Sequence, residues 1–98
     1  MKIVVTGGKG QLGCELKNNP LIKNNSAWLF TDRQTFDLSD LDNIDIYLDI
    51  CKPNIIINCA AYTSVDNAEH DFETADIINH KSVELIAKWS NNNNCKLV

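Results

Sequence analysis

The sequence has no long apolar run and no excess of positive charge. Its most apolar segments, such as Ile55-Ile56-Ile57, are far shorter than the roughly 20 apolar residues that a membrane-spanning helix needs. Nine lysine and arginine residues stand against 13 aspartate and glutamate residues, which gives a net charge of −4. Nucleic acids and anionic membranes are therefore poor candidates for partners, because both are bound through clusters of positive charge.

Paired metal ligands and a secretion signal are also missing. The four cysteines, Cys14, Cys51, Cys59 and Cys95, form no C-x-x-C pair, and neither histidine has a second ligand at a useful spacing. We therefore predict reduced thiols and no metal site. The chain passes directly from Met1-Lys2 into an apolar segment, without the regions of a signal peptide. These features favour a cytoplasmic protein.

Glycine is scarce, and all four glycines lie between residues 7 and 13, where an apolar segment passes into a helical pattern. Gly7, Gly10 and Gly13 have the spacing G-x-x-G-x-x-G. In a strand–turn–helix unit, the first glycine allows a tight turn, the second admits a pyrophosphate, and the third lets the helix pack on the strand. The N–H groups and dipole at the helix start would then bind the anion.

The surrounding pattern alternates between strands and helices. Short β-branched or aromatic runs predict strands at 2–6, 28–31, 54–61 and 96–98. Helical periodicity predicts helices over 11–18, from Leu41 to Cys51 with Ser39 as the N-cap, and over 72–89. The last helix would carry an apolar stripe of Ala75, Ile78, Ser82, Leu85, Ile86 and Trp89. We therefore predict an α/β fold: a partial Rossmann-type, doubly wound parallel sheet of about four strands with helices on both faces. Residues 1–98 form one dinucleotide-binding domain in this interpretation.

Asp32 follows the second predicted strand, nineteen residues after Gly13. A carboxylate at about this spacing accepts hydrogen bonds from the hydroxyls of an adenosine ribose, which favours NAD. The next residue, Arg33, could instead pair with the 2′-phosphate of NADP. Both residues could also be ordinary turn residues. The sequence leaves NADPH and NADH open as cofactors.

The third predicted strand ends in small residues. Cys59, Ala60 and Ala61 form its carboxyl end, where small side chains leave room for a ligand lying across the sheet. Ordinary packing of a helix on a sheet can require the same room.

Three segments together resemble the dTDP-4-dehydrorhamnose reductase family of extended short-chain dehydrogenases/reductases. They are the glycine turn at 6–13, the segment at 36–40 and the segment at 52–69. The first two are common in the wider superfamily, whereas the last is specific to the rhamnose reductase branch. The resemblance covers essentially the whole chain but only the amino-terminal part of a typical member. It implies reduction of dTDP-4-dehydro-L-rhamnose to dTDP-L-rhamnose with NADPH or NADH.

The resemblance also implies roles for individual residues. Gly10-Gln11-Leu12 matches the pyrophosphate-binding turn, and Asp32 matches an acidic residue near the adenosine ribose. Asp37-Leu38 matches the pair that meets the adenine edge, and Ala61-Tyr62-Thr63 matches the stretch towards the nicotinamide ribose. The predicted cofactor-binding residues are Gly7, Gly10, Gln11, Leu12, Gly13, Asp32, Arg33, Asp37, Leu38, Ala60, Ala61, Tyr62 and Thr63.

The catalytic pair of the family has no match in these residues. Family members carry Tyr-x-x-x-Lys, in which the tyrosine is the general acid and the lysine lowers its pKa. Here Tyr47 is followed at that spacing by Cys51, and Tyr62 by Asp66. We therefore predict no catalytic residue, a domain truncated in its fourth strand and no substrate domain.

Other functions stay open on the sequence. One is a non-catalytic dinucleotide-binding or regulatory module like the methionine adenosyltransferase regulatory subunit, and another is a sugar-nucleotide epimerase or dehydratase of the extended family. A sugar-nucleotide substrate is expected only in a full-length form. A sheet that stops within its fourth strand exposes an edge, so self-association through that edge is also expected.

Overall fold

The computed structural model describes residues 1–60 and 77–98, in which four parallel strands form a single sheet. The strands lie in the order β2-β1-β3-β4. They are β1 (Ile3–Thr6), β2 (Trp28–Phe30), β3 (Ile55–Asn58) and β4 (Lys96–Leu97). The helices are α1 (Gln11–Lys17), α2 (Leu41–Cys51), the π-helical turn η1 (Ile77–Lys81) and α5 (Ser82–Asn92).

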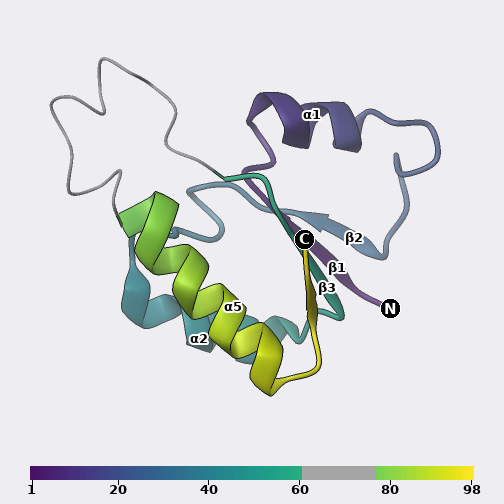
Figure 1. Cartoon of the computed structure of the whole chain (residues 1–98). Helices are drawn as coiled ribbons and strands as arrows, with labels where there is room; N and C mark the ends of the chain where they lie inside the picture. The colour runs from purple at the N-terminus through teal and green to yellow at the C-terminus, as the bar shows by residue number, and fades with distance from the viewer. Residues whose placement is uncertain (61–76) are drawn as a thin grey trace, which may run out of the picture.

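The helices cover both faces of the sheet, as the sequence predicted. Because β2 and β3 lie on opposite sides of β1, the crossovers through α1 and α2 run in opposite directions along the sheet. Figure 1 shows α1 on one face, with α2 and α5 packed side by side on the other. The predicted α/β, doubly wound parallel sheet is confirmed.

The strands β1, β2 and β3 end at the same level. The parallel register pairs Val5 with Phe30 and Thr6 with Asn58. The turn after β1 and the loops after β2 and β3 therefore meet at one edge of the sheet. In an open α/β sheet, this carboxyl edge beside the reversal in strand order is where ligands bind.

The main core lies between the sheet and the pair α2 and α5. Its buried members come from β3, both helices and the loop after β2: Phe36, Leu38, Ile44, Leu48, Ile56, Ile86 and Trp89. Complete burial of an aliphatic side chain contributes about 1.5–3 kcal/mol. This core therefore fixes the loop that carries Phe36 and Leu38 against the helices.

The start of α2 differs from the prediction. Asp40, not Ser39, is the N-cap residue, and it makes no capping bond through its side chain. The Ser39 hydroxyl instead donates to Asp37 Oδ1 at 2.6 Å, so its position within the loop is fixed by Asp37. The helix ends at Cys51, and the C-cap residue Lys52 has a φ of +50°, in the left-handed region just before Pro53.

The predicted helix over 72–89 is partly outside the described residues. Its described portion begins with η1 and continues as α5 to Asn92, three residues beyond the predicted end. The Ser82 hydroxyl donates to the Ile78 carbonyl oxygen at 2.6 Å, where the π-helical turn passes into α5. Buried Ser82, Ile86 and Trp89 confirm this part of the predicted apolar stripe.

No helix in the described part of the chain is both long and apolar enough to cross a membrane. All four cysteines are free thiols. Within residues 1–60 and 77–98, no three His, Cys, Asp or Glu side chains are grouped to bind a metal ion.

Candidate functional site

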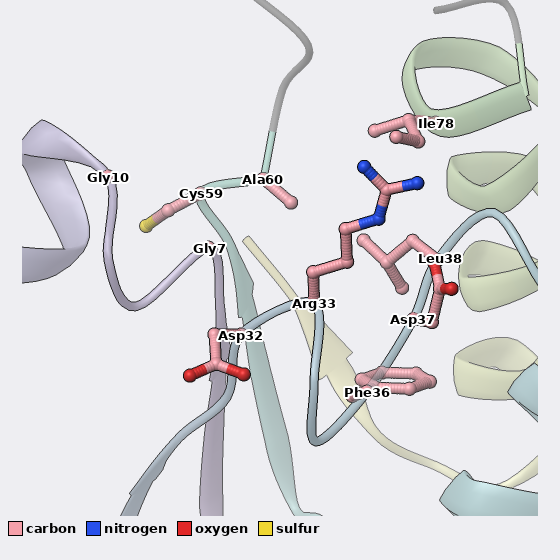
Figure 2. A pocket seen from close by; sticks show the side chains of 10 residues that line it. All are labelled: Gly7, Gly10, Asp32, Arg33, Phe36, Asp37, Leu38, Cys59, Ala60 and Ile78. Atoms are coloured by element: carbon pink, nitrogen blue, oxygen red, sulfur yellow. The ribbon is translucent and has the colours of Figure 1, made fainter. Parts of the chain in front are cut away.

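A pocket of about 220 Å³ lies at the carboxyl ends of β1, β2 and β3. Figure 2 shows the turn after β1 on one side, the loop after β2 below, and Ala60 and Ile78 at the top. Its lining residues are Gly7, Gly10, Asp32, Arg33, Phe36, Asp37, Leu38, Cys59, Ala60 and Ile78. Pockets that enclose drug-sized ligands measure about 300–1,000 Å³, so this space fits part of a dinucleotide rather than all of it.

Gly7 allows the chain to turn sharply at the end of β1. Its φ is +66°, a left-handed conformation that side chains other than glycine rarely adopt. A Cβ on Gly7 would lie 2.7 Å from the Ala60 backbone nitrogen and 2.8 Å from the Cys59 carbonyl carbon. The turn therefore packs against the backbone that follows β3, which no side chain at residue 7 would permit.

Gly13 lets α1 pack on the same turn. A Cβ on Gly13 would contact the Gly7 carbonyl oxygen and lie 2.8 Å from the Gly8 Cα. Gly10, in contrast, is exposed, and its added Cβ would meet only the Gly7 carbonyl oxygen, at 3.3 Å. Gly7 and Gly13 therefore serve the packing of the turn, and Gly10 leaves open space at the pocket. That Gly10 admits a pyrophosphate stays a prediction.

The start of α1 presents backbone donors next to Gly10. Its first internal bond runs from the Cys14 N–H to the Gly10 carbonyl oxygen at 2.9 Å. Within the described residues, the N–H groups of Gln11, Leu12 and Gly13 have no hydrogen-bond acceptor. Such donors at a helix start favour an anion, since their partial positive charge is otherwise unmatched.

The Thr6 hydroxyl and the Gly8 amide hold the three strand ends together. Thr6 Oγ1 donates to Asn58 Oδ1 and accepts a bond from the Ala60 N–H at 3.3 Å. The Gly8 N–H donates to the Thr31 carbonyl oxygen at 2.7 Å. These bonds tie the ends of β1, β2 and β3 into one support for the pocket.

Asp32 is part of a turn and of an ion pair. Its Oδ1 accepts the N–H bonds of Gln34 at 2.8 Å and Thr35 at 3.1 Å. Its Oδ2 lies 3.3 Å from Nζ of Lys9, which belongs to the glycine turn. The Thr35 bond, together with those of Gln34 and Lys9, holds the pKa of Asp32 below its ordinary value. The carboxylate is therefore charged at neutral pH.

Asp37 is held by one of its two oxygens. Asp37 Oδ1 accepts bonds from the Ser39 hydroxyl at 2.6 Å and the Ser39 N–H at 2.9 Å. The Ser39 hydroxyl bond is the main cause that lowers the pKa of Asp37, and the charge of Arg33 contributes as well. The other oxygen, Oδ2, has no partner within residues 1–60 and 77–98 and remains an available acceptor.

Phe36 and Leu38 connect the pocket to the core. Both are buried, and the Phe36 ring stacks on the Tyr47 ring of α2 with centroids 4.1 Å apart. Burial raises the pKa of Tyr47, and the nearby Cys51 adds to this effect. The loop after β2 is therefore anchored by apolar packing, which fixes the backbone from Asp32 to Leu38.

The structure brings seven of the predicted site residues together in the pocket. These are Gly7, Gly10, Asp32, Arg33, Asp37, Leu38 and Ala60. Gln11, Leu12 and Gly13 lie at the adjoining start of α1 and do not line the pocket. The predictions for Ala61, Tyr62 and Thr63 concern residues outside the described ranges.

Four residues of the site had no predicted site role. Phe36, Cys59 and Ile78 line the pocket, and Lys9 pairs with Asp32. Cys59 was predicted only as a small residue at a strand end, and burial raises the pKa of its thiol. Ile78 belongs to the predicted apolar stripe of the helix, and nothing in its spacing distinguishes a pocket residue from a core residue. Lys9 occupies a variable position of the glycine pattern.

Comparison with known proteins places the whole chain in a family. The family model described as the RmlD substrate binding domain matches residues 1–98. The dTDP-4-dehydrorhamnose reductase of Aggregatibacter actinomycetemcomitans is 37% identical over 89 residues, which are 89% of this chain and 30% of that protein. The Escherichia coli K12 enzyme of the same name is 37% identical over 93% of this chain and 31% of its own length.

Solved structures of such reductases share the fold. The enzyme from Clostridium acetobutylicum superposes with a TM-score of 0.85 at 32% identity, over 99% of this chain and 34% of that one. A Bacillus anthracis dTDP-4-dehydrorhamnose reductase in complex with NADP gives 0.79 at 33% identity, over 99% and 35%. The chain thus spans about a third of the length of these relatives. By its match from the first residue to the last, it belongs to the RmlD substrate binding domain family.

Proposed function

We propose that this chain is the dinucleotide-binding part of an NAD(P)H-dependent reductase that acts on dTDP-4-dehydro-L-rhamnose. The observation that carries the proposal is the position of the pocket, beside a glycine turn where the strand order reverses. The NADP complex of the Bacillus anthracis relative, which shares this fold over 99% of the chain, supports the choice of ligand. The reductases among the relatives support the reaction.

The glycine turn has the features that a pyrophosphate needs. Gly10 is exposed beside the pocket, and the N–H groups of Gln11 and Leu12 have no acceptor among the described residues. A pyrophosphate over Gly10 would accept these donors and approach the backbone without a side chain in between. Gly7 and Gly13 would contribute through the close packing of the turn rather than through contact with the ligand.

The loop after β2 suits the adenosine half of the cofactor. Leu38 and Ile78 offer apolar surface for the adenine ring, and the available Asp37 Oδ2 can accept a bond from the exocyclic amine of adenine. Asp32 and Arg33 lie where the ribose would follow. Ala60 would leave room for the cofactor across the end of β3, and 61–63 would continue the site towards the nicotinamide ribose.

The reaction itself would need residues that these 98 do not supply. The bound cofactor would deliver a hydride, while the Tyr-x-x-x-Lys pair implied by the family resemblance has no match here. We therefore assign to this chain the binding and orientation of the dinucleotide. The general acid and the sugar-nucleotide site are proposed for a full-length form of the protein.

A fluorescence titration of the purified chain with NADPH and with NADH tests the proposal. We expect saturable binding of at least one dinucleotide. Gly10→Val is the matched variant, because it places a branched side chain at the exposed position where the pyrophosphate would lie. That variant should fold and lose binding. Absence of binding by the unchanged chain at millimolar concentrations of either cofactor would refute the proposal.

Two further proposals concern the state of the protein. Its four free thiols suit a reducing compartment, so we place it in the cytoplasm.

The strand β4 lies at the edge of the sheet, and Val98 beside it is 66% exposed. Unpaired edge strands favour pairing with another chain, so we expect self-association. Sedimentation of a clean monomer at high concentration would count against this second point.

A further inference from the structure

We propose that the chain carries a second binding site, between α1 and β2, for a small aromatic ring that bears a phosphate. The site is a pocket of about 290 Å³ lined by the last residue of α1, the turn that follows and β2. Figure 1 shows this connection leaving α1 and returning to the start of β2. The pocket shares no lining residue with the proposed dinucleotide pocket, so the inference does not depend on the proposed function.

Two aromatic side chains of β2 line this second pocket. Trp28 and Phe30 are half-buried, and they point to the same face of the sheet because they are two residues apart in the strand. Their rings stack at an angle of 17° with centroids 6.1 Å apart, within the range of an offset stack. Since β2 lies at the edge of the sheet, the exposed parts of these rings can stack on a further planar ring.

Two lysines give the second pocket a positive charge. Lys17 and Lys23 line it and are exposed, and neither side chain makes an ion pair or a hydrogen bond with a residue in 1–60 or 77–98. No aspartate or glutamate within those ranges lines the pocket. Two lysines and no acid amount to a charge of +2, in a chain whose net charge is −4. This local reversal of charge favours an anionic ligand.

Hydrogen bonds fix the turn that joins α1 to β2. The Asn25 N–H donates to the Ile22 carbonyl oxygen at 2.9 Å, and the Trp28 N–H donates to the Asn25 carbonyl oxygen at 3.1 Å. Asn24 has a φ of +67°, a left-handed conformation that asparagine tolerates. The Asn24 amide and the Ser26 hydroxyl line the pocket and have no hydrogen-bond partner among the described residues. Both groups can donate to phosphate oxygens beside the lysines.

The rings and the charges together define the class of ligand. Sites for drug-sized ligands measure about 300–1,000 Å³, so a mononucleotide suits this pocket better than a dinucleotide. A nucleoside monophosphate would stack its base on Trp28 and Phe30 and place its phosphate near Lys17 and Lys23. Bonds between an ammonium and a phosphate are charge-assisted and therefore stronger than bonds between neutral groups.

Isothermal titration calorimetry of the purified chain with uridine monophosphate (UMP) tests the inference. Uridine and inorganic phosphate are the controls, because they carry the ring and the charge separately. We expect saturable binding of UMP that is about tenfold tighter than the binding of uridine or of phosphate. Higher salt should weaken it, since both lysines are exposed. A saturating concentration of NADPH should leave UMP binding unchanged.

Three variants test the position of the site. Lys17→Met and Lys23→Met should each weaken UMP binding about threefold, the effect of one exposed charge, and leave uridine binding unchanged. Trp28→Leu should weaken UMP binding about tenfold, because the base loses the indole on which it stacks. Lys88→Met, at an exposed position of α5 that does not line this pocket, is the matched control and should change nothing. Circular dichroism checks that each variant folds.

Several outcomes would overturn the inference. One is absence of UMP binding, and another is binding of uridine or phosphate alone as tightly as UMP. Loss of UMP binding on addition of NADPH would place UMP in the dinucleotide pocket instead. Equal UMP binding by Lys17→Met, Lys23→Met and the unchanged chain would place it away from the lysines. A chain that bound UMP as expected but no dinucleotide would refute the proposed function and leave the second site standing.

Discussion

Replacement of Gly7 by alanine is expected to lower the free energy of unfolding by about 3 kcal/mol. Two costs combine. The left-handed conformation at a φ of +66° costs an L-residue about 1–2 kcal/mol. The added Cβ would also lie 2.7 Å from the Ala60 backbone nitrogen, so the backbone after β3 must shift, and overpacking of this kind costs about 1–3 kcal/mol.

Urea unfolding followed by tryptophan fluorescence measures this change, since Trp28 and Trp89 lie in different parts of the fold. A domain of this size has a free energy of unfolding of about 5–15 kcal/mol, so the variant should remain folded but be much less stable. Its Tm should fall by about 12 °C or more.

Gly10→Ala is the matched control. Its φ of −75° is accessible to alanine, and the added Cβ would meet one atom at 3.3 Å. Its cost in stability should be about 1 kcal/mol or less, since glycine is only moderately better than alanine as an N-cap. If Gly7→Ala proved as stable as Gly10→Ala, the account of the turn would be wrong.

Three further predictions concern the core, one part-buried hydrogen bond and pH. Ile86→Ala, at a fully buried position, should lower the free energy of unfolding by about 2–5 kcal/mol. Ile50→Ala, at a position 80% exposed, should lower it by about 0.5 kcal/mol or less. Equal losses in chemical unfolding would contradict the assigned core. Trp89→Phe should lower the free energy of unfolding by about 1 kcal/mol, because it removes the 2.8 Å bond from the indole N–H to Asp49 Oδ1. If Asp49→Leu lowered the free energy of unfolding by nothing, this bond would not stabilise the fold. Because the pKa of Asp37 in the folded chain lies below its ordinary 3.8, chiefly through Ser39, its ionised form stabilises the fold at neutral pH, and this contribution is lost as the pH falls below about 3.8. Thermal unfolding between about pH 5 and about pH 2.5 should therefore show a smaller loss of stability for Asp37→Asn than for the unchanged chain.

The order of elements was predictable because hydrophobic periodicity is local. The buried run Ile3–Thr6, the three spaced glycines and the isoleucines of β3 each define their element without knowledge of the rest of the fold. The doubly wound topology follows from their alternation and from right-handed crossovers. Seven of the predicted site residues then meet in one pocket, since carboxyl strand ends in a parallel sheet share one edge.

Contacts between distant segments were not predictable in the same way. The pairing of Lys9 with Asp32 depends on how far the turn after β1 and the loop after β2 approach each other. The N-cap at Asp40 depends on the bond that the Ser39 hydroxyl makes with Asp37. The π-helical turn brings Ile78 to the pocket, and a search for a period of 3.6 residues does not detect such a turn.

Amide NMR of the chain during addition of NADPH shows whether the dinucleotide lies over the glycine turn. We expect the largest shifts on Gly10 to Gly13 and on the loop from Asp32 to Leu38, with little change in β4 and the end of α5. Binding that left the glycine turn unchanged and shifted amides only elsewhere would contradict a dinucleotide site at this turn, because no pyrophosphate would then lie over Gly10.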